Sequence, residues 1–389
     1  MRRKILFIHH AIGMGGAPIS LSCLIAGLSK ERFQVYVVMP KRAGNDAVKQ
    51  LFKNAGAEVI EEKHIRPFHG VNGCRCDSFR ERAYALLSAF PTAWATRNQV
   101  RYIEPDLVHL NTSVLPFAAL GARLSGLNVP VVTHVREVVL KNWWGRMLSF
   151  FNRQFSDWHV GIDQSGLNRI GVSKERSTVV HNSCDAEAMT LCEKSVSELR
   201  RRFNCQQDTV LFTSICRIAK SNGTLELANA LAQHSAELPS NVRFVFCGFE
   251  GNGTEYAEEA RAAISQSEHV FAMDFTNGVA NLIGASDVVM APFVSAHSAR
   301  VVIEGALLGK PALVTDFPNL REQISENKTG LVFRFDQLDT LIDAIRRFAD
   351  RNKTAEMGEA AREFAELHYS LEKNVAKIED LYSKILKCV

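Results

Sequence analysis

Residues 296–316 read AHSARVVIEGALLGKPALVTD, and this stretch contains one complete helix–turn–strand unit. We predict a helix that is capped near Ser298 and ends at the Gly-Lys-Pro turn of residues 309–311, where an apolar strand begins. Its buried side is formed by Val302, Ile303, Ala306 and Leu307. The first-turn N–H groups of such a helix favour a phosphate, and Glu304 on the second turn is placed to accept hydrogen bonds from a ribose diol.

The same alternation of helix and strand extends in both directions along the chain. The first half contains the apolar segments KILFIHH, FQVYVVMP, AEVIEE, PDLVHLN and PVVTHVRE. The second half contains TVLFTSICRI, RFVFCGF, HVFAMDF, DVVMAPF, PALVTD and GLVFRF. Strands that are apolar on both faces and separated by helices indicate parallel sheets covered on both sides. We therefore predict an α/β fold of two doubly wound, Rossmann-like domains, with a ligand cleft between the carboxyl ends of their strands.

The restart of the pattern sets the domain boundaries. A chain of 389 residues exceeds the usual size of one domain. We expect a first domain at residues 1–186, a second at 187–368, and a C-terminal amphipathic helix at 369–389 that packs back toward the first domain.

The composition excludes several classes of function. A net charge of +4 is too small to indicate nucleic acid as the main partner. Nine cysteines are scattered, and the close pair Cys74 and Cys76 lacks the second pair of a zinc site, so we expect reduced thiols in the cytoplasm. The apolar run at the N-terminus is broken by His9 and His10, which favours a buried first strand over a signal peptide. No apolar run is long enough to span a membrane.

The first candidate site is the glycine loop HHAIGMGGAPISL, which lies between a strand and a helix. Gly13, Gly15 and Gly16 let the backbone approach an anionic ligand. A dinucleotide site is disfavoured because Pro18 stands where the third glycine of G-x-G-x-x-G would be, and because the second strand ends without an acidic residue. A tight strand–helix turn without a ligand is the alternative.

The second candidate site is VVTHVREVV, where His134, Arg136 and Glu137 follow a strand at the functional rim of such folds. A neutral imidazole both donates and accepts hydrogen bonds, so it suits a sugar hydroxyl. The alternative is a surface pair of Arg136 and Glu137 beside a structural histidine. His109, in LVHLN, is interpreted as structural.

The third candidate site is SICRIAKSNGTLEL in the second domain. Arg217 and Lys220 follow its first strand, and together they would offset the charge of a diphosphate. Either cation alone is an ordinary surface residue.

The segment LKNWWGRMLSFFNRQFSDW mixes aromatic and basic residues in the manner of a helix lying in a membrane interface. The membrane-contact candidates are Trp143, Trp144, Phe150 and Phe151. The segment FRERAYALLSAFPTAWATRN has a similar character. Helices packed on the sheet or on each other are the alternative, because aromatic stripes usually lie in a core.

Taken together, these stretches resemble the retaining glycosyltransferases of family 4, which have the GT-B fold and use nucleotide-sugar donors. The matching stretches cover most of the chain in the order of the family: the Gly15-Gly16 loop, PDLVHLN, THVRE, VVHNSCD, RIAKSNGTLEL, ASDVVMAPF, RVVIEGALLGKPALVTD and TGLVF. Each motif is weak by itself, but their order is specific.

The resemblance implies a role for each candidate residue. His134, Arg217 and Lys220 form the catalytic set, of which His134 matches the histidine near the transferred sugar. The donor-binding set is Gly15, Gly16, Arg217, Lys220, His297, Ser298, Ala299, Arg300 and Glu304. The acceptor-binding set is Gly13, Arg136 and Glu137. Glu304 matches the second glutamate of the family's E-x7-E motif, which contacts the ribose.

Two positions depart from the family pattern. The family's lysine falls at Asn222, and the first glutamate of E-x7-E falls at Ala296. The version His297-Ser298-Ala299-Arg300 with Glu304 indicates a subfamily variant rather than decay.

The implied reaction is retaining transfer of a sugar from a nucleotide-diphosphate donor to a glycan hydroxyl, with a polyprenyl-linked glycan as the expected acceptor. We expect no cofactor and no metal, because positive groups and helix N-termini stabilise the leaving diphosphate and no D-x-D motif is placed to hold a metal. The expected setting is surface polysaccharide biosynthesis (lipopolysaccharide or capsule), on the cytoplasmic face of the membrane. The alternative is a catalytically inactive relative that binds nucleotide sugars or acts as a scaffold.

Overall fold

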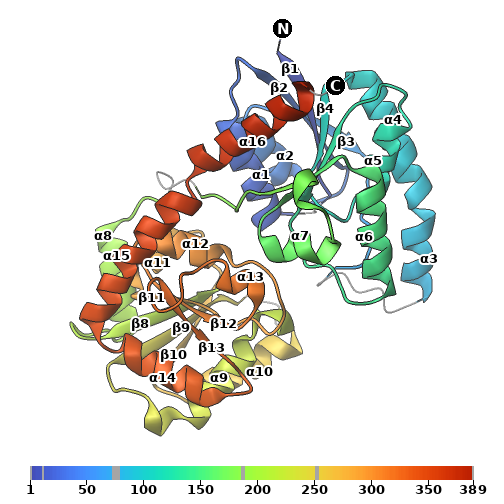
Figure 1. Cartoon of the computed structure of the whole chain (residues 1–389). Coiled ribbons are helices and arrows are strands. Elements are labelled where there is room, and N and C mark those ends of the chain that lie inside the picture. The colour runs from blue at the N-terminus through green and yellow to red at the C-terminus, as the bar shows by residue number, and fades with distance from the viewer. Residues whose placement is uncertain (1, 11–12, 72–78, 185–188, 250–253, 388–389) are drawn as a thin grey trace. The chain divides into compact units, whose positions relative to one another are not determined.

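The structure is a computed structural model that describes residues 2–10, 13–71, 79–184, 189–249 and 254–387 (Figure 1). It divides into two compact units, Met1–Ser183 with Leu371–Val389, and Cys184–Ser370. The boundaries expected from the sequence, after residues 186 and 368, differ from these by a few residues. Cys74 and Cys76 lie outside the described residues.

The first unit contains a seven-stranded parallel sheet in the order β3-β2-β1-β4-β5-β6-β7. Its strands are β1 (Arg3–Ile8), β2 (Phe33–Pro40), β3 (Glu58–Glu62), β4 (Leu107–Leu110), β5 (Val131–Val135), β6 (Trp158–Gly161) and β7 (Ser177–Val179). Its helices are α1 (Gly16–Gly27), α2 (Asp46–Asn54), α3 (Phe79–Leu87), α4 (Ala89–Ile103), α5 (Pro116–Arg123), α6 (Trp143–Phe155), α7 (Gln164–Ile170), the 3₁₀ turn η1 (Lys174–Arg176) and α16 (Leu371–Lys387).

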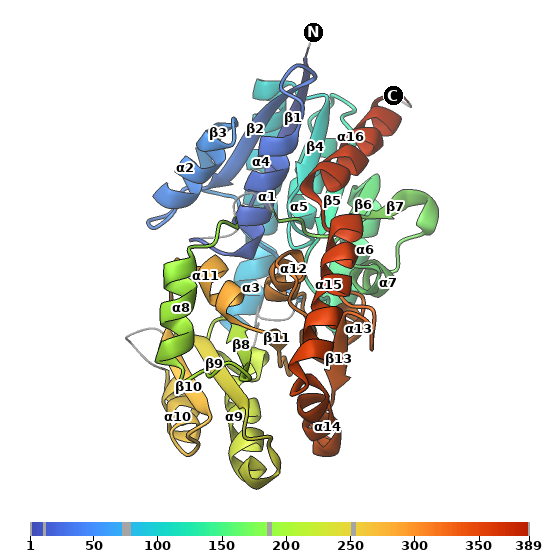
Figure 2. The ribbon, with the colours of Figure 1, turned by 90° about the vertical axis from the view of Figure 1, so that its left-hand side faces the viewer.

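Alternate residues of β1 bury themselves on opposite faces of this sheet, as the period of a strand requires. Ile5 and Phe7 pack in a core with α1, α2 and α16, whereas Leu6 and Ile8 pack in a core with α4 and α5. Figure 2 shows α1 and α16 in front of the sheet of this unit. The C-terminal helix α16 contributes Val375, Ile378, Leu381, Tyr382 and Ile385 to the first of these cores.

The second unit contains a six-stranded parallel sheet in the order β10-β9-β8-β11-β12-β13. Its strands are β8 (Val210–Ile215), β9 (Val242–Phe249), β10 (Val270–Asp274), β11 (Val288–Ala291), β12 (Ala312–Thr315) and β13 (Gly330–Phe333). Its helical elements are α8 (Glu193–Arg202), η2 (Lys220–Asn222), α9 (Thr224–Gln233), η3 (Ser235–Glu237), α10 (Glu255–Ile264), α11 (Val279–Ala285), α12 (Arg300–Leu307), α13 (Pro318–Arg321), α14 (Leu338–Phe348) and α15 (Arg351–His368).

The two faces of this second sheet are again buried by alternate residues. Phe212 of β8 packs in the core that includes α9, α10 and α14, and Leu211 packs with α8 and α11 on the other face. Each unit is thus a doubly wound parallel sheet with helices on both faces, which is the predicted fold class.

Candidate functional site

The strand order of each sheet reverses at one point, and such a switch point is where open α/β sheets bind ligands. In the first unit the switch lies between β1 and β4, and in the second unit it lies between β8 and β11. The sequence-predicted site residues follow the carboxyl ends of these strands and of β5.

Arg217 and Lys220 lie just beyond the carboxyl end of β8, and both side chains are exposed. Asn222, which occupies the position of the family's lysine, is buried, and its Nδ2 donates to the backbone oxygen of Arg217 at 2.6 Å. Asn222 therefore closes the turn that holds Arg217, and its buried side chain is not a cation that could face a ligand.

Gly223 lets this turn approach the end of β11. Its φ is +68°, and a Cβ built on it would lie 1.8 Å from the backbone oxygen of Pro292. Because only glycine fits this close approach, the backbone that follows β8 and the backbone that follows β11 are held against each other at the switch point.

His297 follows β11 and lies near Arg217. Its ring stacks on Phe293 with centroids 3.8 Å apart, and Nδ1 lies 2.9 Å from the backbone oxygen of Ser295. Burial lowers the pKa of His297 below its ordinary value, the Ser295 oxygen opposes this, and the positive charge of Arg217 lowers the pKa further. The imidazole is thus neutral at pH 7 and lies within electrostatic range of the Arg217 guanidinium.

The helix that carries Glu304 begins within one residue of the predicted position. Its N-cap residue is Ala299, next to Ser298, and no side chain of its own caps it. Gln323 takes over the capping role: its Oε1 accepts from the Ala299 N–H at 2.9 Å, and its Nε2 donates to the Ala299 oxygen at 3.0 Å. A glutamine 24 residues further along the chain leaves no signal in the local pattern.

Glu304 is paired with Arg300 one helical turn earlier. Nη2 of Arg300 lies 2.8 Å from Oε1 of Glu304, and Nε lies 3.1 Å from the same oxygen. The Glu304 side chain is only 14% exposed, and its ion pair with Arg300 fixes the position of the carboxylate. Ala296, at the first position of the motif, adds no carboxylate.

In the first unit, the glycine loop is tied to the end of β2. The Gly13 N–H donates to Oδ1 of the buried Asn45 at 2.9 Å, and Nδ2 of Asn45 donates to the Pro40 oxygen at 2.9 Å. Gly13 has a φ of +75°, a backbone conformation that glycine adopts readily. Gly15 caps α1 without a side chain, and Gly16 begins the helix, so the exposed N–H groups of this end remain available to an anion.

His134 and Arg136 belong to a network at the carboxyl ends of β4, β5 and β7. Nε of Arg136 donates to Oδ1 of Asn111 at 2.9 Å, and Nη1 donates to Oδ1 of Asn182 at 2.7 Å. Nη2 of Arg136 lies 3.5 Å from Nδ1 of His134. His134 is buried, and its Nε2 makes no hydrogen bond within the part of the chain that the structure describes.

Glu137 binds the two residues that follow Asn111 at the end of β4. Its Oε1 accepts from Oγ1 of Thr112 at 2.5 Å, and its Oε2 accepts from the N–H and the hydroxyl of Ser113 at 3.1 and 2.8 Å. These contacts join Arg136 and Glu137 to other residues, in contrast to the alternative of a surface pair between the two. Glu137 instead fastens the loop that follows β4.

Several buried histidines in this region are held neutral. Burial lowers the pKa of His109 to about 3, with a smaller contribution from Arg136. Burial also lowers the pKa of His134 well below its ordinary value, assisted by Arg136 and then His109. His109 lies between Phe7 and His134 and binds the Tyr382 hydroxyl at 2.6 Å, which agrees with its interpretation as a structural residue.

The four membrane-contact candidates of α6 do not share one surface. Trp143 and Phe150 are exposed, by 61% and 50%. Trp144 and Phe151 pack inward against Phe68, with ring centroids 5.6 and 6.0 Å away. Grouping all four as membrane contacts is therefore corrected for Trp144 and Phe151, which belong to the core of the first unit.

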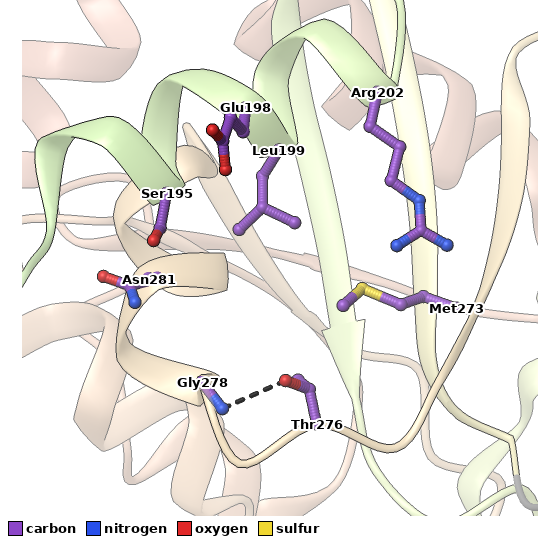
Figure 3. A pocket seen from close by; sticks show the side chains of 8 residues that line it. All are labelled: Ser195, Glu198, Leu199, Arg202, Met273, Thr276, Gly278 and Asn281. Carbon is purple, nitrogen blue, oxygen red and sulfur yellow. Dashed lines mark hydrogen bonds between the residues drawn. The ribbon is translucent and has the colours of Figure 1, made fainter.

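A cavity of about 390 Å³ lies at the edge of the second unit, between α8 and the segment that joins β10 to α11 (Figure 3). Its lining includes Glu198, Arg202, Thr276 and Asn281. None of the predicted donor-binding residues lines it.

The described parts of the chain contain no group of three or more His, Cys, Asp or Glu side chains arranged to hold a metal ion. They also contain no helix whose length and apolar character would let it cross a membrane.

Sequence reasoning missed the amide side chains of the site. Asn45, Asn111 and Asn182 each bind a predicted site residue. Asn111 and Asn182 lie inside the matched stretches PDLVHLN and VVHNSCD, so a polar amide shortly after each strand is a signal that could have identified them.

Comparison with known proteins places both halves of the chain in one class. The model of Glycosyltransferase Family 4 matches residues 14–188, and the model of Glycosyl transferases group 1 matches residues 195–364. The chain is 20% identical to UDP-Gal:alpha-D-GlcNAc-diphosphoundecaprenol alpha-1,3-galactosyltransferase of Escherichia coli, over 94% of this chain and 96% of that protein. It is 21% identical to N-acetyl-alpha-D-glucosaminyl L-malate synthase of Bacillus anthracis, over 82% of this chain and 84% of that protein.

The fold is shared with solved structures. HepE of Anabaena, crystallised in complex with UDP-glucose, superposes with a TM-score of 0.77 at 19% identity, over 98% of this chain and 99% of that chain. At this identity the likeness concerns the fold.

Proposed function

The chain belongs to the GT-B glycosyltransferases of the family 4 type, and from that premise we propose the reaction that it catalyses. It transfers a hexose from a UDP-sugar to a hydroxyl of a polyprenyl-diphosphate-linked glycan, with retention of the anomeric configuration, in surface polysaccharide biosynthesis. The UDP donor is supported by the relative named as a UDP-Gal transferase and by the HepE complexes with UDP and UDP-glucose. The lipid-linked acceptor is supported by the diphosphoundecaprenol in the name of the same relative.

The observation that carries the donor assignment is the group of cations at the switch point of the second unit. Arg217 lies near His297, Lys220 follows in the same turn, and Arg300 begins α12. Two phosphates carry negative charges that such groups bind through charge-assisted hydrogen bonds. Glu304, held by Arg300, is the acceptor for the ribose hydroxyls.

The proposed chemistry needs no carboxylate at position 296. The bond between the anomeric carbon and the diphosphate oxygen breaks, and a new bond forms to the acceptor oxygen on the same face of the sugar. The proton of the acceptor hydroxyl passes to a phosphate oxygen of the leaving diphosphate. Arg217 and Lys220 stabilise the negative charge that develops on that group, so the reaction is proposed to proceed without a metal.

The first unit is proposed to supply the groups around the sugar and the acceptor. A neutral His134 has one ring nitrogen near Arg136 and the other without a partner among the described residues, which leaves Nε2 for a sugar hydroxyl. The loop of Gly13, Gly15 and Gly16 offers backbone N–H groups to the acceptor and the diphosphate. Trp143 and Phe150 are exposed apolar side chains that suit a peripheral position on the cytoplasmic face of a membrane.

The test is transfer from a panel of UDP-hexoses to polyprenyl-diphosphate-linked N-acetylglucosamine by the purified full-length protein. We expect one donor to be used, the anomeric configuration of the product to match that of the donor by NMR, and chelation of divalent ions to leave the rate unchanged. If donors bind in a thermal-shift assay but none is transferred or hydrolysed with this acceptor present, the chain is the inactive relative, and the proposed function is overturned.

A further inference from the structure

The outer faces of α3 and α4 carry a set of exposed apolar and aromatic side chains. The α3–α4 surface is defined here as Tyr84, Leu86, Leu87, Phe90, Trp94, Arg97 and Arg101. Leu87, Phe90 and Trp94 are exposed by 76%, 73% and 51%. The opposite side of α4 is buried on α5 and the sheet through Thr92, Ala93, Ala95, Thr96, Val100 and Ile103. Figure 1 shows α3 and α4 at the margin of the first unit, with α5 between α4 and the sheet.

The aromatic rings of this surface are paired with guanidinium groups. Phe90 and Trp94 stack with centroids 6.1 Å apart, and the Arg97 guanidinium lies 4.9 Å from the Trp94 centroid. At the other end, the Arg66 guanidinium lies 4.7 Å from the Tyr84 ring and also donates to its hydroxyl. A ring capped by a cation offers an apolar body together with a group that seeks phosphate, which is the chemistry of the headgroup region.

The two helices are predominantly basic. Residues 79–103 contain four arginines and a single acidic residue, Glu81. A basic surface with exposed aromatic rings is complementary to a bilayer that contains anionic lipids. A protein partner would have to supply matching acidic residues, whereas the anionic bilayer supplies this charge by itself.

We propose that the α3–α4 surface lies in the headgroup region of an anionic lipid bilayer and holds the first unit on the membrane. The inference rests on the proposed function only in one respect: a lipid-linked acceptor is located at the membrane surface. It adds α3 and α4 to the contact proposed for Trp143 and Phe150 of α6, whose neighbours Trp144 and Phe151 pack against Phe68.

The test is flotation of the full-length protein, without donor or acceptor, on vesicles of phosphatidylcholine with and without phosphatidylglycerol. We expect binding to the anionic vesicles and loss of at least about tenfold in the affinity of the Phe90→Ser, Trp94→Ser variant. Leu367→Ser is the matched control, because Leu367 is 60% exposed on α15 of the second unit. We expect the control to float like the wild type.

Two further variants separate charge from apolar contact. Arg97→Gln, Arg101→Gln should lose about fivefold in affinity per arginine on anionic vesicles. Trp94→Phe should still float but should show less quenching of tryptophan fluorescence by brominated lipids. Phe90, Trp94 and Arg101 are exposed, whereas Arg97 is half-buried and donates to the Leu124 oxygen. Unchanged thermal unfolding in the absence of vesicles verifies that the variants are folded.

Undiminished flotation of the Phe90→Ser, Trp94→Ser variant would overturn the inference. So would a wild type that does not float but self-associates through this face, shown by a dimer in sedimentation that the same variant abolishes. Transfer to a water-soluble acceptor is measured in parallel, and it should be unchanged in these variants. Failure of flotation is thereby distinguished from failure of the proposed function, which would abolish transfer in the wild type as well.

Discussion

Glu304 is the residue whose surroundings the structure reveals beyond what the sequence indicates. The pattern of α12 identifies it as the second glutamate of the family motif, but it does not show that Arg300 holds it. Arg300 and Glu304 lie four residues apart on one face of the helix, and the low exposure of both favours a fixed pair. This pair gives the site an ordered carboxylate although Ala296 adds none.

Replacing Glu304 by Gln should weaken donor binding more than catalysis. In the proposed site the carboxylate accepts hydrogen bonds from the ribose in both the ground state and the transition state, so its loss is expected to raise the KM for the UDP-sugar about tenfold and to change kcat little. Steady-state kinetics measure this split. Glu326→Gln is the control, because Glu326 pairs with Arg321 in the same unit. Equal KM values in the Glu304→Gln variant and the wild type would refute the ribose assignment.

The buried histidines of the first unit predict a specific pH dependence of stability. His109 has a pKa of about 3 when folded, and burial also lowers the pKa values of His9 and His134, whereas all three return to about 6.5 on unfolding. The unfolded chain therefore binds more protons below pH 6.5. Stability should be complete above that pH and should fall by about 1.4 kcal/mol per pH unit for each such histidine as the pH decreases to 5.

Urea unfolding between pH 5 and 7 measures this slope. The His109→Gln variant removes one titrating group, so its slope should be shallower by about 1.4 kcal/mol per pH unit, whatever its stability at pH 7. Carboxylates contribute equally to both proteins. A slope identical to that of the wild type would contradict the assignment of a depressed pKa to His109.

At the scale of single elements, the sequence predicts the strands well and the turns poorly. Five strands of the first unit and all six of the second coincide with the apolar segments identified from the pattern, and β7 lies within STVVHN. β6 (Trp158–Gly161) is absent from the predicted strands: it is four residues long, and its first residue ends the aromatic segment. A short strand is stabilised mainly by the neighbouring strands of its sheet, and the local sequence pattern carries no information about those neighbours.

The turn after β8 requires Gly223 for two reasons: its φ is positive, and a side chain there would collide with the Pro292 oxygen. Gly223→Ala should cost about 3 kcal/mol or more, because the Cβ would overlap the Pro292 oxygen in addition to the cost of a left-handed backbone. Gly126→Ala is the control: Gly126 also has a positive φ, of +80°, but no atom lies within 4 Å of its Cβ position, and it should cost only about 1 kcal/mol.

Urea unfolding gives both values, and UDP binding should weaken in the Gly223→Ala variant alone, because this turn carries Arg217. Equal destabilisation by the two substitutions would show that the contact with Pro292 does not constrain the turn.

At the scale of the whole molecule, the order of the sequence motifs is sufficient to predict the fold. Each of two half-chains repeats the alternation of buried strand and helix, and both form parallel sheets with one switch point. The contacts that complete the site were not predictable in the same way. Gln323 caps α12, Asn45 holds the Gly13 loop, and Tyr382 reaches His109 from the last helix. These partners are far apart in sequence, and only the folded chain brings them together.

The central claim is that the cations at the switch point of the second unit bind a nucleotide diphosphate, and calorimetric titration with UDP tests it most directly. Arg217→Ala removes a charge-assisted contact and should weaken binding by about tenfold to a hundredfold. Arg347→Ala is the control, because Arg347 is an exposed arginine in the last turn of α14 in the same unit. The account predicts that the wild type and the control bind UDP equally and that Arg217→Ala binds it much more weakly. Equal UDP affinity in all three proteins would contradict it.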